Sequence, residues 1–260
     1  MDSSRHLEIL VEAAWRVREA LLRAERESRG LSLERRKRIL DEAAEEALET
    51  YLRRSGASVR LESEEGEATI GSGELLLIAD PLDGTTNMAV GIPFSAVSLM
   101  LSETEYLSGA IASIVLDIPR GVAYKAAKGL GAWRDDTPIR LRRKARPLSK
   151  AILSIDISKS APMNRLRRLI AKARHLRQLG SAALSICLIA EGTLDAHIDV
   201  RGVLRAVDSA AALHILKEAG GVYRLNDVYM GDLKLKRDSR LSVIAASNDE
   251  MLRRIKELLR

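Results

Sequence analysis

One segment, DPLDGTTN at residues 80–87, holds the densest group of side chains that could do chemistry. It follows the apolar run 75–79, which reads as a buried strand, and its proline and glycine favour a sharp turn directly after that strand. The turn would bring two carboxylates, Asp80 and Asp83, into one small volume beside the carbonyl oxygen of Leu82. Hard oxygen ligands of this kind are the ones that Mg²⁺ prefers.

The same segment could also bind an anion. Gly84 and Thr85 stand where a helix could begin, and the first backbone N–H groups of a helix attract negative charge. A cation site beside an anion site indicates Mg²⁺ together with phosphate. The plainer alternative is an Asp-Gly turn with capping threonines, which any surface loop could use. From this segment alone the two interpretations stay open.

The composition limits the class of protein. The chain has 260 residues, of which 46% are hydrophobic, enough for one large domain or two subdomains that share a core. The formal net charge of +6 suits an anionic small substrate or nucleic acid and does not decide between them. Aromatic residues make up only 3%, which disfavours a protein that stacks single-stranded bases. The single cysteine, Cys187, excludes an internal disulfide, fits a reducing compartment and is expected to fill the core.

No segment resembles a membrane or export signal. Charges recur throughout the first twenty residues, and the most apolar run, 88–101, is too short to cross a bilayer. We therefore expect a cytoplasmic protein that does not bind membranes. Scarce amide side chains together with 30% charged residues favour a thermophilic source.

The first half of the chain changes its hydrophobic period near residue 57. Apolar residues recur at helical spacing before it, which predicts two long helices, at 4–29 and at about 32–54. After it the period is two, as in strands. Strands are expected at 59–61, 75–80, 94–102, 106–116 and 121–126, followed by a glycine-rich strand or bulge at 128–133. One antiparallel-rich sheet against two helices would account for a first subdomain, residues 1–135.

The second subdomain, residues 136–260, alternates strands and helices, which indicates an α/β arrangement. Strands are expected at 151–155, 175–179, 194–200, 222–225 and 241–246. Helices are expected at 163–173, 181–191, 206–219 and 248–259. This subdomain would complete the site that the first subdomain begins.

A magnesium site needs more oxygen ligands than DPLDG supplies. Glu64 and Glu65 end the strand expected beside 75–80, although adjacent glutamates after a strand also suit a polar loop. Asp208 begins an otherwise apolar helix, where an acid usually serves as a cap or a partner of the helix dipole. No Cys/His zinc pattern, Walker loop, dinucleotide fingerprint or G-x-S-x-G motif occurs. Oxygen-only metal chemistry is what remains.

Taken together, these pieces resemble the inositol monophosphatase and fructose-1,6-bisphosphatase superfamily, in particular its archaeal members. The matching segments occur in the same order over about residues 57–250. They read ESEEG (62–66), DPLDGTTN (80–87), GIPFSAVSL (91–99), YKAAKGLGAW (124–133), GSAALSIC (180–187), DAHIDVRG (195–202), VDSAAALHILKEAGG (207–221) and VIAASN (243–248). A single motif would be weak, whereas the ordered set is specific.

The resemblance implies a fold, a metal and a set of ligands. The fold would be a layered αβαβα sandwich, usually dimeric. Two or three Mg²⁺ ions would be bound by the carboxylates of Glu64, Asp80, Asp83 and Asp208 and by the carbonyl of Leu82. In such enzymes Mn²⁺ is a possible substitute and Li⁺ a possible inhibitor.

The resemblance also implies catalytic roles. Backbone N–H groups of Gly84 and Thr85 would bind the phosphate, and Thr85 would orient the attacking water. An acid on the second helix would polarise Thr85, and Asp41 is the candidate because Asp41 and Glu45 reproduce the D-x-x-x-E spacing of the family. Relatives usually carry a glycine- and lysine-bearing loop before this acid, whereas residues 27–41 are expected to be helical. This departure puts the activating pair in question.

Three further positions match the family's site. Glu65 would support the metal ligands without binding the ion itself. Ser181 and Arg201 match positions that line the sugar side of the substrate pocket, although packing in the core explains Ser181 equally well.

These patterns favour a Mg²⁺-dependent phosphoric monoester hydrolase that acts on inositol-1-phosphate, fructose-1,6-bisphosphate or both, usually as a homodimer. One alternative is a 3′(2′),5′-bisphosphate nucleotidase. Another is a catalytically weak relative that acts as a binding or RNA-associated regulator, as the positive charge and the missing loop suggest. The retained metal carboxylates count against that regulator, so a small phosphorylated substrate is the expected partner and nucleic acid is not.

Overall fold

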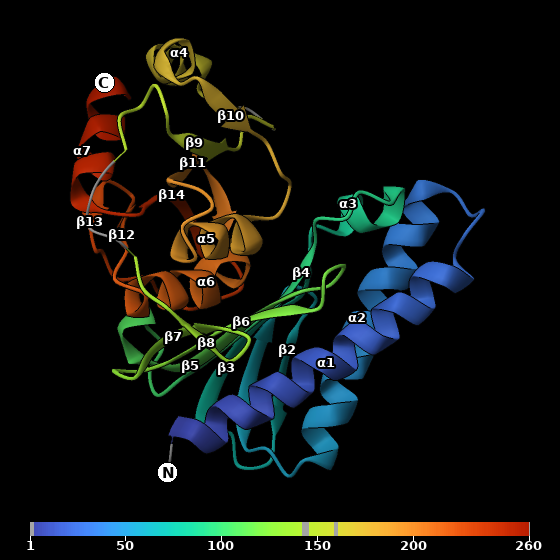
Figure 1. Ribbon diagram of the computed structural model, residues 1–260. Coiled ribbons are helices and arrows are strands. Elements are labelled where there is room, and N and C mark those ends of the chain that lie inside the picture. Colours follow the sequence, from blue (N-terminus) through green and yellow to red (C-terminus); the bar gives the residue numbers. More distant parts are fainter. Residues whose placement is uncertain (1–2, 142–145, 159–160, 260) are drawn as a thin grey trace.

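Helices and sheets alternate in five layers (Figure 1). The structure is a computed structural model that describes residues 3–141, 146–158 and 161–259. The outer helical layers and the central one each contain two helices: α1 (Ser3–Glu27) and α2 (Leu33–Arg54), α5 (Ala182–Ala190) and α6 (Ala206–Glu218), and α4 (Met163–Lys172) and α7 (Asp249–Leu258). One sheet lies on each side of the central pair. The predicted αβαβα sandwich is therefore confirmed.

The first sheet has eight strands in the order β2-β1-β3-β4-β5-β6-β7-β8. They are β1 (Val59–Ser63), β2 (Glu67–Ile70), β3 (Leu75–Asp83), β4 (Ala96–Ser102), β5 (Ala110–Asp117), β6 (Val122–Ala127), β7 (Gly131–Arg134) and β8 (Thr137–Ile139). Within this sheet only β1 and β3 pair in parallel, and the other pairs are antiparallel. The sheet is therefore antiparallel-rich, as predicted. The edge strands β2 and β8 are short and largely exposed, so they lack the apolar alternation that would have predicted them. Because β8 pairs with β7, this sheet continues past residue 135.

The second sheet has six strands in the order β10-β9-β11-β14-β12-β13. They are β9 (Ile152–Ile155), β10 (His175–Arg177), β11 (Ala196–Arg205), β12 (Val222–Leu225), β13 (Val228–Tyr229) and β14 (Arg240–Ala246). The exposed, two-residue β13 was not predicted. Strand β11 extends to Arg205, beyond the predicted end at residue 200, and α6 begins at the next residue.

The pattern of apolar residues explains which helix takes which layer. In α1 one stripe is buried, including Leu10, Val17 and Leu21, because only one face of this helix meets a sheet. In α6 ten residues are buried, because both of its faces meet sheets. A short helix, α3 (Thr85–Val90), follows β3 and lies against α2.

The turn between β3 and α3 requires glycine at position 84. Gly84 has φ +95°, in the left-handed region that other residues rarely adopt. A Cβ atom there would lie 3.0 Å from the carbonyl oxygen of Phe94. Conformation and space therefore both exclude a larger residue, and the turn holds the DPLDGTTN segment in one shape.

Substituting Leu213, a fully buried residue of α6, tests the central layer. Leu213→Ala would remove apolar contacts and leave a cavity, so the free energy of unfolding should fall by ~2–5 kcal/mol. Denaturant titration followed by circular dichroism measures it. Leu130→Ala is the control, because Leu130 is 59% exposed and its truncation should change stability by less than ~0.5 kcal/mol. Equal losses would show that α6 does not anchor the fold.

Candidate metal centre

Three carboxylates from distant parts of the sequence converge beside the first turn of α6. Glu64 follows β1, Asp80 lies in β3, and Asp208 lies in the first turn of α6. One oxygen atom from each of the three lies within 4.8 Å of the other two. The sequence analysis selected all three residues, and the fold brings them together.

Burial makes it unfavourable to ionise the carboxylates of this cluster. Burial and the neighbouring carboxylates of Asp83 and Asp208 raise the pKa of Asp80 well above its ordinary value. Burial, followed by the charge of Asp208, raises the pKa of Asp83 to about 7. Burial also raises the pKa of Asp208. Oxygen ligands that resist ionisation until a cation arrives are suited to a divalent metal ion, so these residues fit the Mg²⁺ that the family resemblance implies.

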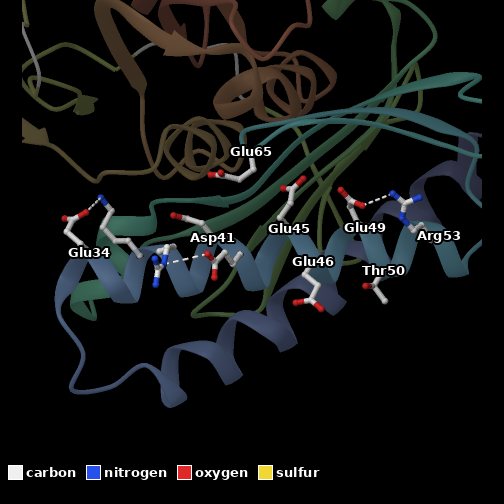
Figure 2. A pocket seen from close by; sticks show the side chains of 11 residues that line it. Glu34, Asp41, Glu45, Glu46, Glu49, Thr50, Arg53 and Glu65 are labelled. Atoms are coloured by element: carbon white, nitrogen blue, oxygen red, sulfur yellow. Dashed lines mark hydrogen bonds and ion pairs between the residues drawn. The ribbon is translucent and has the colours of Figure 1, made fainter.

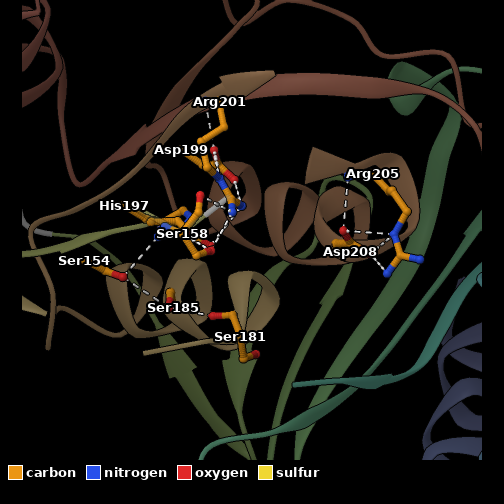
Figure 3. A network of polar contacts seen from close by, with 10 residues as sticks. Ser154, Ser158, Ser181, Ser185, His197, Asp199, Arg201, Arg205 and Asp208 are labelled. Carbon is orange, nitrogen blue, oxygen red and sulfur yellow. Dashed lines mark hydrogen bonds and ion pairs between the residues drawn. The ribbon is translucent and has the colours of Figure 1, made fainter. Parts of the chain in front are cut away.

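One guanidinium partly compensates the cluster. Arg205 Nη1 lies 2.5 Å from Glu64 Oε1. Arg205 Nη2 lies 2.9 Å from Asp208 Oδ1 (Figure 3). Its single positive charge could not balance the four carboxylates, including Asp83, if all of them were ionised. The sequence analysis missed Arg205. The signal was available, because a cation at the start of a helix opposes the helix dipole and therefore needs an anionic partner.

Two hydrogen bonds from the start of α5 hold the carboxylate of Asp83 in place. Its Oδ2 accepts hydrogen bonds from Ser181 Oγ at 2.6 Å and from the backbone N–H of Ala183 at 2.8 Å. Ser181 is also the N-cap of α5, where its oxygen accepts from the backbone N–H of Leu184 at 3.2 Å. The buried hydroxyl predicted to contact substrate is thus already bound to Asp83.

Thr85 and Asp41 meet although they are 44 positions apart in the sequence. Thr85 Oγ1 lies 3.0 Å from Asp41 Oδ1 and 3.1 Å from the carbonyl oxygen of Leu82, and its single proton can be donated to only one of them at a time. Burial raises the pKa of Asp41 to about 6. The predicted helix over 27–41 is interrupted at residues 28–32 and resumes at Leu33, and this geometry leaves Asp41 within reach of Thr85.

An acidic groove runs along α2 beside the centre. It has a volume of about 740 Å³, and Asp41, Glu45 and Glu65 are among the residues that line it (Figure 2). Glu45 Oε1 accepts a hydrogen bond from Ser63 Oγ at 2.6 Å, and burial raises the pKa of Glu45. Glu65 therefore lies next to the candidate water-activating pair, on the side that is open to solvent.

Arg201 is already neutralised by neighbouring acids. Its Nη2 lies 2.6 Å from Asp199 Oδ2 and 2.9 Å from Asp156 Oδ2, and its Nη1 donates to Ser158 Oγ at 2.8 Å (Figure 3). Only 8% of its side chain is exposed. A substrate at this position would meet a fixed, charge-balanced guanidinium.

The two buried histidines and the cysteine belong to the protein interior and not to the metal centre. Burial lowers the pKa of His197 and of His214 to about 4, so both are neutral, and neither belongs to the carboxylate cluster of the described residues. Cys187 is buried, as predicted. Among the helices that the structure describes, none combines the length and the apolar character needed to cross a membrane.

The sequence of this chain matches a known protein family and several of its members. Residues 2–259 match the Inositol monophosphatase family. The fructose-1,6-bisphosphatase/inositol-1-monophosphatase of Methanocaldococcus jannaschii is 33% identical over 224 residues, covering 85% of this chain and 84% of the relative. The Nus factor SuhB of Pasteurella multocida is 33% identical over 193 residues, covering 70% of this chain and 69% of the relative.

A solved structure agrees with the sequence matches. A structure described as an inositol monophosphatase-fructose 1,6 bisphosphatase superposes with a TM-score of 0.74 at 31% identity, covering 85% of this chain and 83% of that chain. The match therefore covers more than four fifths of each chain. The resemblance inferred from the ordered motifs is confirmed, and the chain belongs to the inositol monophosphatase family.

Proposed function

We propose that the chain is a Mg²⁺-dependent phosphomonoesterase that hydrolyses a sugar or polyol phosphate. The observation that carries the proposal is the convergence of Glu64, Asp80 and Asp208 beside the Thr85–Asp41 pair. Membership of a phosphatase family supports the reaction class. The names of the relatives supply inositol-1-phosphate and fructose-1,6-bisphosphate as the first substrates to test.

The proposed metal ligands are the carboxylates of Glu64, Asp80, Asp83 and Asp208 and the carbonyl oxygen of Leu82. When bound, Mg²⁺ supplies Lewis-acid activation of water and of the phosphoryl oxygens. Two or three ions, with Mn²⁺ as a substitute and Li⁺ as an inhibitor, are part of the proposal. Glu65 would support these ligands from the groove side.

The residues of the chain position the reactants. Backbone N–H groups of Gly84 and Thr85 would bind phosphate oxygens, because the first N–H groups of a helix have no partner within it. Ser181 keeps Asp83 oriented through its 2.6 Å hydrogen bond. Arg201, with its charge balanced by Asp156 and Asp199, would offer a fixed polar edge to substrate hydroxyl groups.

The proton path begins at Thr85. When Asp41 is ionised, Thr85 donates its hydroxyl proton to Asp41, and its oxygen is free to accept a hydrogen bond from water. Water attacks phosphorus in line, its proton passes to Thr85 as the Thr85 proton passes to Asp41, and the bond from phosphorus to the alcohol oxygen breaks. The alcohol oxygen takes a proton from solvent, and phosphate leaves.

Phosphate release from inositol-1-phosphate, fructose-1,6-bisphosphate and 3′-phosphoadenosine 5′-phosphate tests the proposal. We expect Mg²⁺-dependent release from one or both sugar or polyol phosphates. Asp80→Asn is the matched control, because the amide oxygen can still accept the hydrogen bond that Leu82 N–H donates at 3.0 Å. This variant should fold normally and lose ~100-fold or more in turnover. Dominant release from the adenosine compound would favour the nucleotidase, and no release from any compound would favour the regulator.

Asp41→Asn separates catalysis from stability. Turnover should fall by ~100-fold or more because Asn cannot accept the proton. The pKa of Asp41 is raised in the folded state, so the stability that its protonated form contributes is lost as the pH rises towards about 6. Metal-free Asp41→Asn should therefore melt at a higher temperature than the wild type at pH 7.5, with the difference shrinking towards pH 4. Unchanged turnover would show that water is activated by another group.

Arg205→Gln tests the balance of charge in the cluster. Without the guanidinium, the metal-free protein should lose ~1–3 kcal/mol of stability, and Mg²⁺ should raise its melting temperature more than that of the wild type. Thermal melts in EDTA and in Mg²⁺ measure both effects. The matched control is Arg134→Gln, which breaks the ion pair to Glu191 at 3.3 Å away from the centre. The same Mg²⁺ response in both variants would contradict the role of Arg205.

A further inference from the structure

Positive charge is concentrated in one part of the chain. Residues 137–190 contain thirteen Lys and Arg residues and one acid, Asp156, whereas the rest of the chain contains 29 Lys and Arg and 35 acids. The excess of positive charge in the whole protein therefore comes from this one stretch. The proposed phosphatase chemistry does not account for it, because the metal centre itself is acidic.

The described part of this stretch places six cations on one outer surface. All six are exposed, and we refer to them as the basic face: Arg165, Arg167, Arg168, Lys172, Arg174 and Arg177. They lie on α4 and on or beside β10, at the end of the molecule opposite α1 and α2 (Figure 1). Leu166 and Leu169 of α4 are buried against the second sheet. The charged residues of this helix therefore lie on its exposed side.

Most cations of the basic face have no acidic neighbour. On the other exposed helices several arginines pair with glutamates of the same helix, as Arg16 does with Glu12 at 2.8 Å and Arg53 with Glu49 at 2.9 Å. On the basic face, within the residues that the structure describes, only Arg165 has an acidic neighbour, at 3.9 Å. Like charges three or four positions apart destabilise a helix, so folding alone does not favour this arrangement.

We infer that the basic face binds the phosphate backbone of duplex DNA without reading its sequence. A cluster of exposed cations matches the dense negative charge of the backbone, and binding would release condensed counterions. This surface lies outside the proposed active site, and the inference does not rest on the proposed phosphatase function.

The chemistry of the surface selects the partner. Residues 137–190 contain no Phe, Trp or Tyr, so the stacking that single-stranded nucleic acids need is missing. The apolar side of α4 is buried, so it cannot insert into a membrane surface. The ten residues of α4 span ~15 Å and would lie along or across the ~12 Å major groove of B-form DNA, whereas the major groove of A-form RNA is too narrow for a helix.

The test compares two triple variants of the full chain. Arg167→Gln/Arg168→Gln/Lys172→Gln removes three charges from the basic face, and Gln preserves the helix because it is a good helix former. Arg16→Gln/Arg29→Gln/Lys128→Gln removes three charges from α1, its exit turn and the segment after β6, where the cations are exposed and paired with glutamates. Both variants have the same net charge, and none of the six residues belongs to the proposed active site.

Fluorescence anisotropy with a short labelled DNA duplex, titrated at several salt concentrations, gives the affinity and its salt dependence. The basic-face variant should bind ~10–100-fold more weakly, and the slope of log K against log salt should fall by about three units. The control variant should keep the wild-type slope, and both variants should keep wild-type phosphatase activity.

Three results would overturn the inference. The first is equal weakening in both triple variants, which would mean that only net charge matters. The second is tighter binding of wild-type protein to double-stranded RNA, single-stranded RNA or anionic lipid vesicles than to DNA. The third is no binding to DNA at low salt.

Discussion

Carboxylates buried side by side repel one another strongly, because the interior of a protein screens charge far less than water does. In this chain Glu64, Asp80 and Asp208 are held within 4.8 Å of one another, and Asp83 raises the cost further. The cluster can persist because Asp80 and Asp208 lie in elements that are locked into a hydrophobic core, and Glu64 directly follows β1. The need to hold these charges together explains much of the architecture around them.

Different layers of the fold hold different acids of the cluster. Strand β3 carries Asp80 and Asp83 in the first sheet, and α6 carries Asp208 between the two sheets. One hydrophobic core packs α6 against residues of both sheets and leaves it no freedom to move away from β3. Hydrogen bonds then set the finer orientation, since Ser181 and the N-terminus of α5 hold one oxygen of Asp83. Packing fixes where the acids are, and hydrogen bonds fix where they point.

The sequence predicted most elements of the fold for physical reasons that the structure makes clear. Long helices such as α1 were predicted because their apolar period is unambiguous, and buried strands such as β5 because they form continuous, largely apolar runs. The strands β2, β8 and β13 were missed because they are short and largely exposed. Each pairs with the strand directly before it, so its partner is local, but two to four mostly exposed residues carry no apolar alternation that would predict a strand.

The site was predictable where ligand chemistry dictates residue type. Glu64, Asp80 and Asp208 follow from what a hard cation needs, together with the family resemblance. The partners of these acids did not follow from the sequence. Arg205 compensates a charge cluster that exists only once three distant segments meet. The pairing of Asp41 with Thr85 was expected only through the family's D-x-x-x-E spacing, because the contact itself depends on how α2 lies over α3. The junction at Arg205 and Ala206, where β11 passes into α6 with no intervening residue, also limits how this protein can evolve. One inserted residue after it would rotate Asp208 by ~100° about the helix axis and carry it out of the cluster, so new specificities must arise through segments of variable length elsewhere.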